Sequence, residues 1–581
     1  MNNELTEKHS LINDTKFRLK ILVLTVLRAF KNVTSSIRKY SDMGLLNQES
    51  VIAFSESDLW NPFDNKDNWI LTAGKIQNLR IAAKNINGTE IKADEVFSFW
   101  KHIGNPNIGK GYVIGREIRE GCIVPTIAGG LCQLSNAIYD AALNANFEIV
   151  ERHKHTKVIK GSLAEQDRDA TVKWNYIDLR FKSKFDFRIE VELTSEKLIV
   201  RFRSEQKNVK TEKDNSKIQD SNKLNDCYSC GNFACFKHPD RTSIQQNIAS
   251  ITFVLDERWP EYDQYIQEIA TSSDTFILPL KRNKLLNTTR YSWTTSMSKN
   301  VQYTNVQGIY RALVLRFKSK KQNNVFEQSL QLDKKIAFAA ARKIPVESTH
   351  LVISQNLLPF LYESGVLGGR TFDVLMTRLP FEKLHERLDA AFSKHHGSAT
   401  LRDFRANEKL VTLENKALTL ARNIITPHSE IKELFRNKVV HLAWHIPSSN
   451  NKIGKGGKVL FPASAVGRKG AYEMKRLAME LNFKFAFTGR VIESDNFWEA
   501  LEVEKFDGDL SSIGLIVYPA HTENQPRQLL KAISLGIPII ATSACGIESS
   551  ENVSIIDIGN FDQLKNEFLS HWRTKVVPIA K

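Results

Sequence analysis

The sequence predicts a multi-domain α/β protein, in which an α+β module precedes two Rossmann-like α/β domains. Its 581 residues correspond to about four domains at roughly 150 residues each. A hydrophobic share of 42% is enough for several cores, and 25% charged residues without a Gly or Pro excess exclude collagen-like and low-complexity chains. Short apolar runs alternate with helical patterns in the C-terminal half, which indicates parallel sheets.

The first segment, residues 1–59, is basic. Eight Lys or Arg stand against three acidic residues in positions 1–40, and Phe17, Ile21, Leu24, Leu27 and Phe30 recur at helical spacing. Such a basic amphipathic helix, within residues 16–39, either contacts an anionic membrane surface or packs on the protein's own core.

No apolar stretch near the N-terminus reaches the roughly 20 residues of a membrane span, and no small-residue cleavage site follows it. Six cysteines without a framework of spaced pairs favour a reducing compartment. We therefore expect a cytoplasmic protein, with peripheral membrane contact as an option. The basic chain carries no nucleic-acid motif, so no nucleic-acid partner is expected.

The second segment, residues 60–203, has alternating runs at 171–177 and 187–193 that predict strands, and one strong helix at 131–145. Two glycines precede that helix and place Cys132 in its first turn, where unpaired N–H groups stabilise a thiolate. His155 and Asp169 follow in order, as a base and an orienting acid would. The alternative is that Cys132 is a small buried hydrophobe.

Five blocks of this segment resemble the ordered signature of the VanW family, which is known from vancomycin-resistance clusters. They are Val96-Phe-Ser-Phe-Trp100, Gly111-Tyr-Val-Ile-Gly115, Gly129-Gly-Leu-Cys-Gln-Leu-Ser135, Glu151-Arg-His-Lys-His155 and Asp169-Ala-Thr-Val172. The family usually has three glycines before the cysteine, whereas this chain has Ala128 at the first position. The resemblance does not imply a particular biochemical activity, but it identifies Cys132, His155 and Asp169 as candidate site residues.

The third segment, residues 204–242, begins as a polar linker that has too few aliphatic residues to order itself. It ends in four soft or borderline metal ligands, Cys227, Cys230, Cys235 and His238. A tetrahedral Cys₃His zinc site would order this coreless stretch. An iron–sulfur cluster and a set of unliganded thiols are the alternatives.

The remaining segments, residues 243–430 and 431–581, are predicted as tandem Rossmann-like domains. The first has strand-like runs at 251–255, 276–280, 351–354 and 372–376. In the second, strand-like runs alternate with helical patterns, in the order 458–462, 469–481, 483–487, 513–518, 525–535, 537–542 and 553–558.

Charged residues in the second of these domains predict a diphosphate site. Arg468 and Lys469 lie where a helix begins after a strand, and a helix N-terminus with adjacent cations suits phosphate. Glu523 follows the 513–518 strand, at the carboxyl end of a parallel strand where open α/β sheets bind ligands.

The stretches 413–428, 516–527 and 529–542 are similar to the GT-B glycosyltransferases that use nucleotide sugars, over about residues 405–570 and more weakly over 243–404. In that family, two glutamates eight positions apart hold the donor sugar and ribose. The first corresponds to Glu523, whereas the second is Lys531. The lysine either contacts phosphate instead or marks a domain without transferase activity.

The sequence therefore favours an enzyme that transfers a sugar from a nucleotide-sugar donor to a cell-envelope acceptor, either a glycan or a lipid-linked precursor. A first alternative is a non-catalytic protein that binds envelope precursors or partners with a degenerate transferase fold. A second is thiol acyl transfer at Cys132, with the C-terminal half recognising the substrate.

Overall fold

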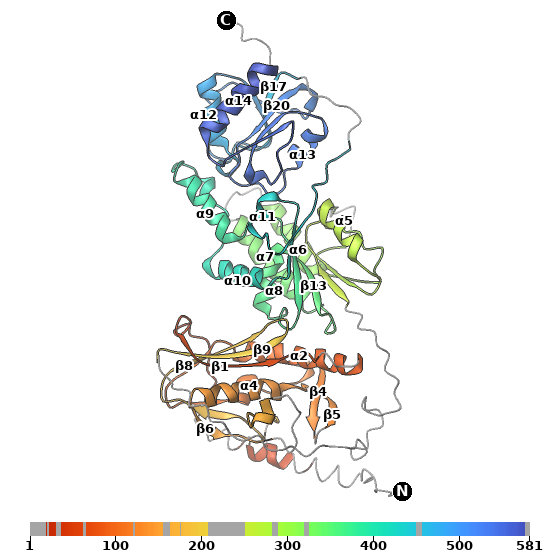
Figure 1. Cartoon of the computed structure of the whole chain (residues 1–581), viewed down its shortest axis with the longest axis vertical. Coiled ribbons are helices and arrows are strands. Elements are labelled where there is room, and N and C mark those ends of the chain that lie inside the picture. Colours follow the sequence, from red (N-terminus) through yellow and green to blue (C-terminus); the bar gives the residue numbers. More distant parts are fainter. Residues whose placement is uncertain are drawn as a thin grey trace. The chain divides into compact units, whose positions relative to one another are not determined.

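The computed structural model describes residues 19, 22–28, 30, 37–61, 66–119, 122–154, 163–174, 176–206, 250–281, 289–318, 325–448 and 456–575. His155 and the Cys227, Cys230, Cys235 and His238 cluster lie outside these ranges. The chain divides into two compact units (Figure 1). The first contains residues 1–250 with two short later segments, 345–349 and 365–370, and the second contains the rest.

The first unit is an α+β module built on a four-stranded antiparallel sheet of order β1-β9-β8-β2. Two long helices pack against it (Figure 1). A cluster of buried phenylalanine rings, including Phe147, Phe181 and Phe202, fills the core. The elements are β1 (Ser50–Asp58), α2 (Lys66–Ile86), β2 (Thr89–Ile91), α4 (Leu131–Asn144), β8 (Phe187–Leu193) and β9 (Lys197–Ser204).

Two smaller sheets complete this unit. One has the antiparallel order β3-β7-β6, and the other is the hairpin β4-β5. The elements are β3 (Val96–Ser98), α3 (Phe99–Ile103), β4 (Ile114–Arg119), β5 (Cys122–Ile127), β6 (Glu148–Glu151) and β7 (Arg180–Lys182).

The predicted strand at 171–177 is wrong. Its described residues form a turn closed by a bridge between Lys173 and Ile177, and the N–H groups of Tyr176 and Ile177 both donate to the Lys173 carbonyl. Thr171 instead donates its backbone N–H to the carbonyl of His153. Alternating polarity did not mark a strand here: only Val172 is buried, and the other described residues of the segment are half-buried.

The second unit begins with a seven-stranded parallel sheet of order β12-β11-β10-β13-β14-β15-β16. Its strands are β10 (Ile251–Val254), β11 (Thr275–Leu278), β12 (Asn300–Tyr303), β13 (His350–Ser354), β14 (Thr371–Leu375), β15 (Asn423–Thr426) and β16 (Val439–His441). Its helices are α5 (Pro260–Ile269), α6 (Asn305–Lys318), α7 (Val325–Ala341), α8 (Leu358–Ser364), α9 (Phe381–Phe392), α10 (Glu408–Leu420) and α11 (Ser429–Leu434).

A second parallel sheet follows, with six strands in the order β19-β18-β17-β20-β21-β22. Together the two sheets confirm the predicted pair of Rossmann-like domains after an α+β module. The elements are β17 (Lys458–Phe461), α12 (Ala471–Leu481), β18 (Phe485–Phe487), β19 (Val503–Lys505), β20 (Ile513–Tyr518), α13 (Arg527–Ser534), β21 (Ile539–Thr542), β22 (Val553–Ile556) and α14 (Phe561–Lys575).

The described part of the basic N-terminal segment is helical at residues 22–28. Its apolar side chains are largely exposed, with Leu22 at 59%, Val26 at 54% and Leu27 at 61%. Arg28 holds this helix to the first unit through an ion pair of 2.6 Å with Glu151. Among the described residues, no helix combines the length and the apolarity that crossing a bilayer requires.

Candidate functional site

The two charged residues predicted on separate loops of the second parallel sheet form an ion pair. Lys469 ends the short 3₁₀ turn Gly467–Lys469, which follows β17, and Glu523 lies on the loop after β20. Lys469 Nζ lies 2.8 Å from Glu523 Oε2 and 3.1 Å from the carbonyl oxygen of Thr522. The structure therefore brings Lys469 and Glu523 together at the carboxyl edge of the sheet, where such folds bind ligands.

Glu523 is held by more than Lys469. The Tyr518 hydroxyl donates to Oε2, and the backbone N–H of Gln525 donates to Oε1 at 2.8 Å. Burial by itself would raise the pKa of Glu523, but the Lys469 charge and these hydrogen bonds outweigh it and lower that pKa. The carboxylate is thus ionised at neutral pH and its orientation is fixed.

Arg468 is placed differently from its neighbour. Its guanidinium lies over the Phe404 ring, 4.1 Å from the ring centroid, and forms no hydrogen bond or ion pair within the described ranges. Burial lowers the pKa of Arg468, although the side chain keeps its charge at neutral pH. A partly buried cation without a carboxylate partner, next to the Lys469–Glu523 pair, is suited to an anionic ligand.

The backbone fixes both loops at this edge. The Arg468 carbonyl accepts hydrogen bonds from the N–H groups of His521 at 3.0 Å and Thr522 at 3.1 Å. Gly470 has φ +81°, and a Cβ there would lie 2.1 Å from the Pro519 carbonyl oxygen, so only glycine allows this approach. Helix α12 begins directly after Gly470 and has no side-chain cap.

Glu493 is a residue of this region that the sequence did not reveal. Its carboxylate accepts hydrogen bonds from the hydroxyls of Ser398, Thr400 and Tyr472. It also accepts the backbone N–H of Gly467, the first residue of the turn that carries Arg468 and Lys469. Its partners lie up to 95 positions away along the chain, so no local motif marks the residue.

Lys531, the residue at the second glutamate position of the transferase motif, is exposed on α13. Its ammonium group makes no hydrogen bond or ion pair with the residues described here. The phosphate contact of Lys531 stays a prediction, since an exposed ammonium group that is unpaired among the described residues neither requires nor prevents it.

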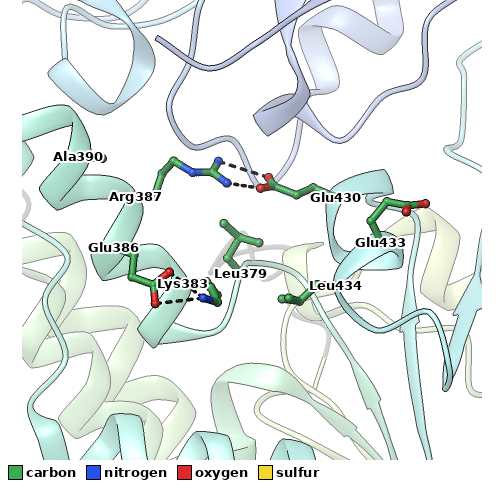
Figure 2. Close-up of a pocket in the computed structure, with 8 residues that line it drawn as sticks. All are labelled: Leu379, Lys383, Glu386, Arg387, Ala390, Glu430, Glu433 and Leu434. Atoms are coloured by element: carbon green, nitrogen blue, oxygen red, sulfur yellow. Dashed lines mark hydrogen bonds and ion pairs between the residues drawn. The ribbon is translucent and has the colours of Figure 1, made fainter.

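A cavity of about 410 Å³ lies at the carboxyl edge of the first parallel sheet, between α9 and α11 (Figure 2). Arg387 crosses it to an ion pair with Glu430, and its Nη1 also donates to the His521 carbonyl at 3.2 Å. This contact joins the cavity to the loop that carries Glu523. The lining residues are Leu379, Lys383, Glu386, Arg387, Ala390, Glu430, Glu433 and Leu434.

The other predicted site lies in the first unit. Cys132 is half-buried in the first turn of α4, with Sγ 3.7 Å from Thr171 Oγ1 and 3.8 Å from the Val172 carbonyl oxygen. Asp169 is buried, and its carbonyl accepts from Arg152 Nε at 2.7 Å. His155 lies outside the described residues, so the structure places Cys132 beside residues 171–172 without showing a base for it.

Gly130, which precedes Cys132 by two positions, leaves room for a buried lysine side chain. Gly130 has φ +97°, and a Cβ there would lie 2.1 Å from Lys75 Cγ. Lys75 Nζ donates to Gln133 Oε1 and to the Leu59 carbonyl, both at 2.7 Å. This buried ammonium group near the start of α4 was not predicted, because Lys75 is far from the motif in sequence.

Several solved structures are similar to the C-terminal half at low identity. The apo galactosyltransferase WaaB is 12% identical with a TM-score of 0.34, covering 56% of this chain and 91% of its own. Anabaena HepE in complex with UDP is 13% identical with a TM-score of 0.33, with the same coverage. TarM is 12% identical with a TM-score of 0.29, covering 42% of this chain and 51% of its own.

About a fifth of the chain resembles curated proteins at higher identity. The vancomycin B-type resistance protein VanW of Enterococcus faecalis is 33% identical over 137 residues, which are 22% of this chain and 49% of that protein. The uncharacterized protein YoaR of Bacillus subtilis is 32% identical over 109 residues, 19% of this chain and 35% of that protein. The chain thus spans half or less of the length of these relatives. The family model of VanW-like proteins matches residues 74–203, and this segment is a VanW-like domain.

Proposed function

We propose that the second unit transfers a sugar from a nucleotide-sugar donor to a hydroxyl of a glycan or lipid-linked cell-envelope acceptor. The observation that carries the proposal is the group formed by Arg468, Lys469 and Glu523 at the carboxyl edge of the β17–β20 sheet. It combines two cations with one oriented carboxylate, the charges that a sugar diphosphate requires.

Each side chain has a role in this proposal. Arg468 and Lys469 bind the diphosphate and stabilise the charge that develops on it as the glycosidic bond to the sugar breaks. Glu523 is released from Lys469 when phosphate binds, and it then accepts hydrogen bonds from sugar hydroxyls. The acceptor hydroxyl forms the new bond to the anomeric carbon, and its proton leaves with the solvent or the diphosphate.

The cavity between α9 and α11 provides a position for the acceptor. It opens at the carboxyl edge of the first sheet, and Arg387 connects it to the loop of Glu523. Lys383 and Arg387 offer cations there, while Glu386, Glu430 and Glu433 offer carboxylates for hydroxyl groups. The lining combines these charged groups with the apolar side chains of Leu379, Ala390 and Leu434, which suits an acceptor that has both polar and apolar parts.

A thermal-shift screen with UDP- and GDP-sugars tests the donor assignment. A ligand that binds only the folded protein adds about 2.7 kcal/mol of stability at one hundred times its Kd. We expect at least one nucleotide sugar to raise the Tm, and the free sugar to leave it unchanged. If no nucleotide sugar raises it, the non-catalytic binding protein becomes the better account.

We also propose that the N-terminal helix contacts an anionic membrane surface from the cytoplasmic side. The exposure of Leu22, Val26 and Leu27 supports this, because an apolar face packed on the protein's own core would be buried. The full chain should co-sediment with vesicles containing phosphatidylglycerol and not with neutral phosphatidylcholine vesicles. Replacing Leu22, Val26 and Leu27 with serine should abolish co-sedimentation, and equal binding by this variant would contradict the proposal.

A further inference from the structure

Two histidines and one glutamate converge beside the Lys469–Glu523 pair. His395 follows α9, Glu473 lies in the first turn of α12, and His521 lies on the loop between β20 and α13. Glu473 Oε1 is 3.0 Å from His395 Nε2 and 2.9 Å from His521 Nε2. One ligand atom from each residue lies within 4.8 Å of the others.

This group is largely buried and incompletely satisfied. The side chains of Glu473 and His521 are 7% and 3% exposed, and that of His395 is 23% exposed. Both imidazoles contact the same carboxylate oxygen, Oε1, whereas the buried Oε2 of Glu473 has no hydrogen-bond partner. A buried carboxylate oxygen without a partner costs free energy that a bound cation would recover.

We propose that His395, Glu473 and His521 bind one divalent transition-metal ion, with zinc as the favoured element. Two imidazole nitrogens and one carboxylate are a ligand set that zinc uses, with a fourth position left for water. Two ligand atoms of a tetrahedral zinc ion lie about 3.3 Å apart. The two contacts of Glu473 at 2.9 and 3.0 Å are slightly shorter than this, and all three ligand atoms lie within 4.8 Å of one another, so rotation of the side chains would bring them to this spacing. Each imidazole would then coordinate through Nε2 and no longer donate to Glu473.

The metal would brace the segments around the donor site. His395 belongs to the segment between β14 and β15, Glu473 to α12, and His521 to the loop that carries Glu523 two positions later. The N–H of His521 already bonds to the Arg468 carbonyl. A metal bound to these three side chains would therefore hold the turn that carries Arg468 and the loop that carries Glu523 in fixed relative positions. It would do so whether or not the donor site is occupied.

Titration with Co²⁺ and Zn²⁺ tests this site in the full chain. Substituting Cys227→Ser, Cys230→Ser and Cys235→Ser removes the competing thiolate ligands. We expect this chain to bind one Co²⁺ with visible d–d absorption and without a thiolate charge-transfer band, and Zn²⁺ to displace the Co²⁺. His395→Ala and Glu473→Gln should each raise the Kd more than about 100-fold, since even the loss of a residue that only supports a ligand costs 10- to 100-fold.

His396→Ala is the matched control, because this exposed histidine neighbours His395 and lies outside the cluster. Its Kd for Co²⁺ should stay within about twofold of that of the parent chain. Because His395 is only partly buried, His395→Ala should stay folded, with a Tm close to that of the parent chain. This variant therefore tests metal binding even if Glu473→Gln unfolds. Absence of Co²⁺ binding, or an unchanged Kd in His395→Ala, would overturn the proposal and leave a hydrogen-bonded triad.

Discussion

At the scale of single residues, the environment of each cysteine determines its reactivity. Cys132 is half-buried at a helix start, whereas Cys545 is fully buried, and burial strongly raises the pKa of the Cys545 thiol. Thiolates at helix N-termini are the reactive ones, and inert structural cysteines are buried in apolar surroundings.

Cys132 should therefore be alkylated at least about tenfold faster than Cys545 in the native chain at neutral pH. Iodoacetamide labelling followed by peptide mass spectrometry measures both rates in one sample. Cys132→Ser provides the control, since it should remove the fast phase and keep the slow one. Equal, slow labelling of both thiols would leave Cys132 as a small core residue and would remove the acyl-transfer alternative.

His102, in the VanW-like domain, is a buried neutral histidine. Its Nδ1 donates to the Ser98 carbonyl at 2.7 Å, and its Nε2 accepts the Tyr40 N–H at 3.2 Å, so neither nitrogen is free to take a proton. Burial lowers the pKa of His102 to about 4, which the hydrogen bond to Ser98 only partly opposes.

Because of His102, we expect the free energy of unfolding to depend on pH. The unfolded chain binds a proton at His102 near pH 6.5, whereas the folded chain binds it only near pH 4. The contribution of His102 to the free energy of unfolding is therefore complete above pH 6.5 and is lost as the pH falls toward 4. The loss amounts to about 3 kcal/mol. Urea unfolding from pH 7 to pH 4.5 should show a weaker pH dependence for His102→Gln. The exposed His153→Gln should behave as wild type does, and an identical slope in all three chains would contradict this assignment.

At the scale of elements, the positions of the parallel strands could be predicted from the sequence. The glutamates that connect loops from distant segments could not. Ile513–Tyr518 and the start of α4 were located correctly, since buried parallel strands are continuous apolar runs and glycines precede the helix. Residues 171–177 were predicted wrongly because their sequence alternates in polarity, whereas the chain closes a local turn there through the Lys173–Ile177 bridge. Glu493 and Glu473 were missed because their partners come from distant segments and carry no local pattern.

The linker element ends in the cluster of Cys227, Cys230, Cys235 and His238, which remains a prediction from the sequence alone. A coreless segment with four correctly spaced ligands becomes ordered when it binds zinc. With zinc also at the proposed His395, Glu473 and His521 site, elemental analysis of the purified chain should find two zinc ions, and Cys230→Ser should carry one fewer. Iron with visible charge-transfer absorption, or an unchanged metal content in Cys230→Ser, would contradict the zinc assignment.

At the scale of the whole molecule, the chain combines a VanW-like domain with two parallel α/β sheets. We propose that the second of these sheets binds the donor, at Arg468, Lys469 and Glu523. Lys469 and Glu523 could be predicted to lie close together, because each follows a strand of the same parallel sheet and the carboxyl ends of those strands meet at one edge. The packing of Arg468 on Phe404 could not be predicted, since it depends on how segments more than sixty positions apart fold together.

The most direct test of the donor assignment is calorimetric titration of the nucleotide sugar found by the thermal-shift screen. Wild type is compared with Arg468→Ala combined with Lys469→Ala, and with Arg476→Ala as a control. Arg476 is an exposed cation on α12 that pairs with Glu480 at 2.8 Å. Each charged hydrogen bond contributes about 1.5 to 3 kcal/mol, so the double variant should bind at least about 100-fold more weakly. The control should bind as wild type does. Equal affinity in all three chains would contradict the donor site at Arg468 and Lys469.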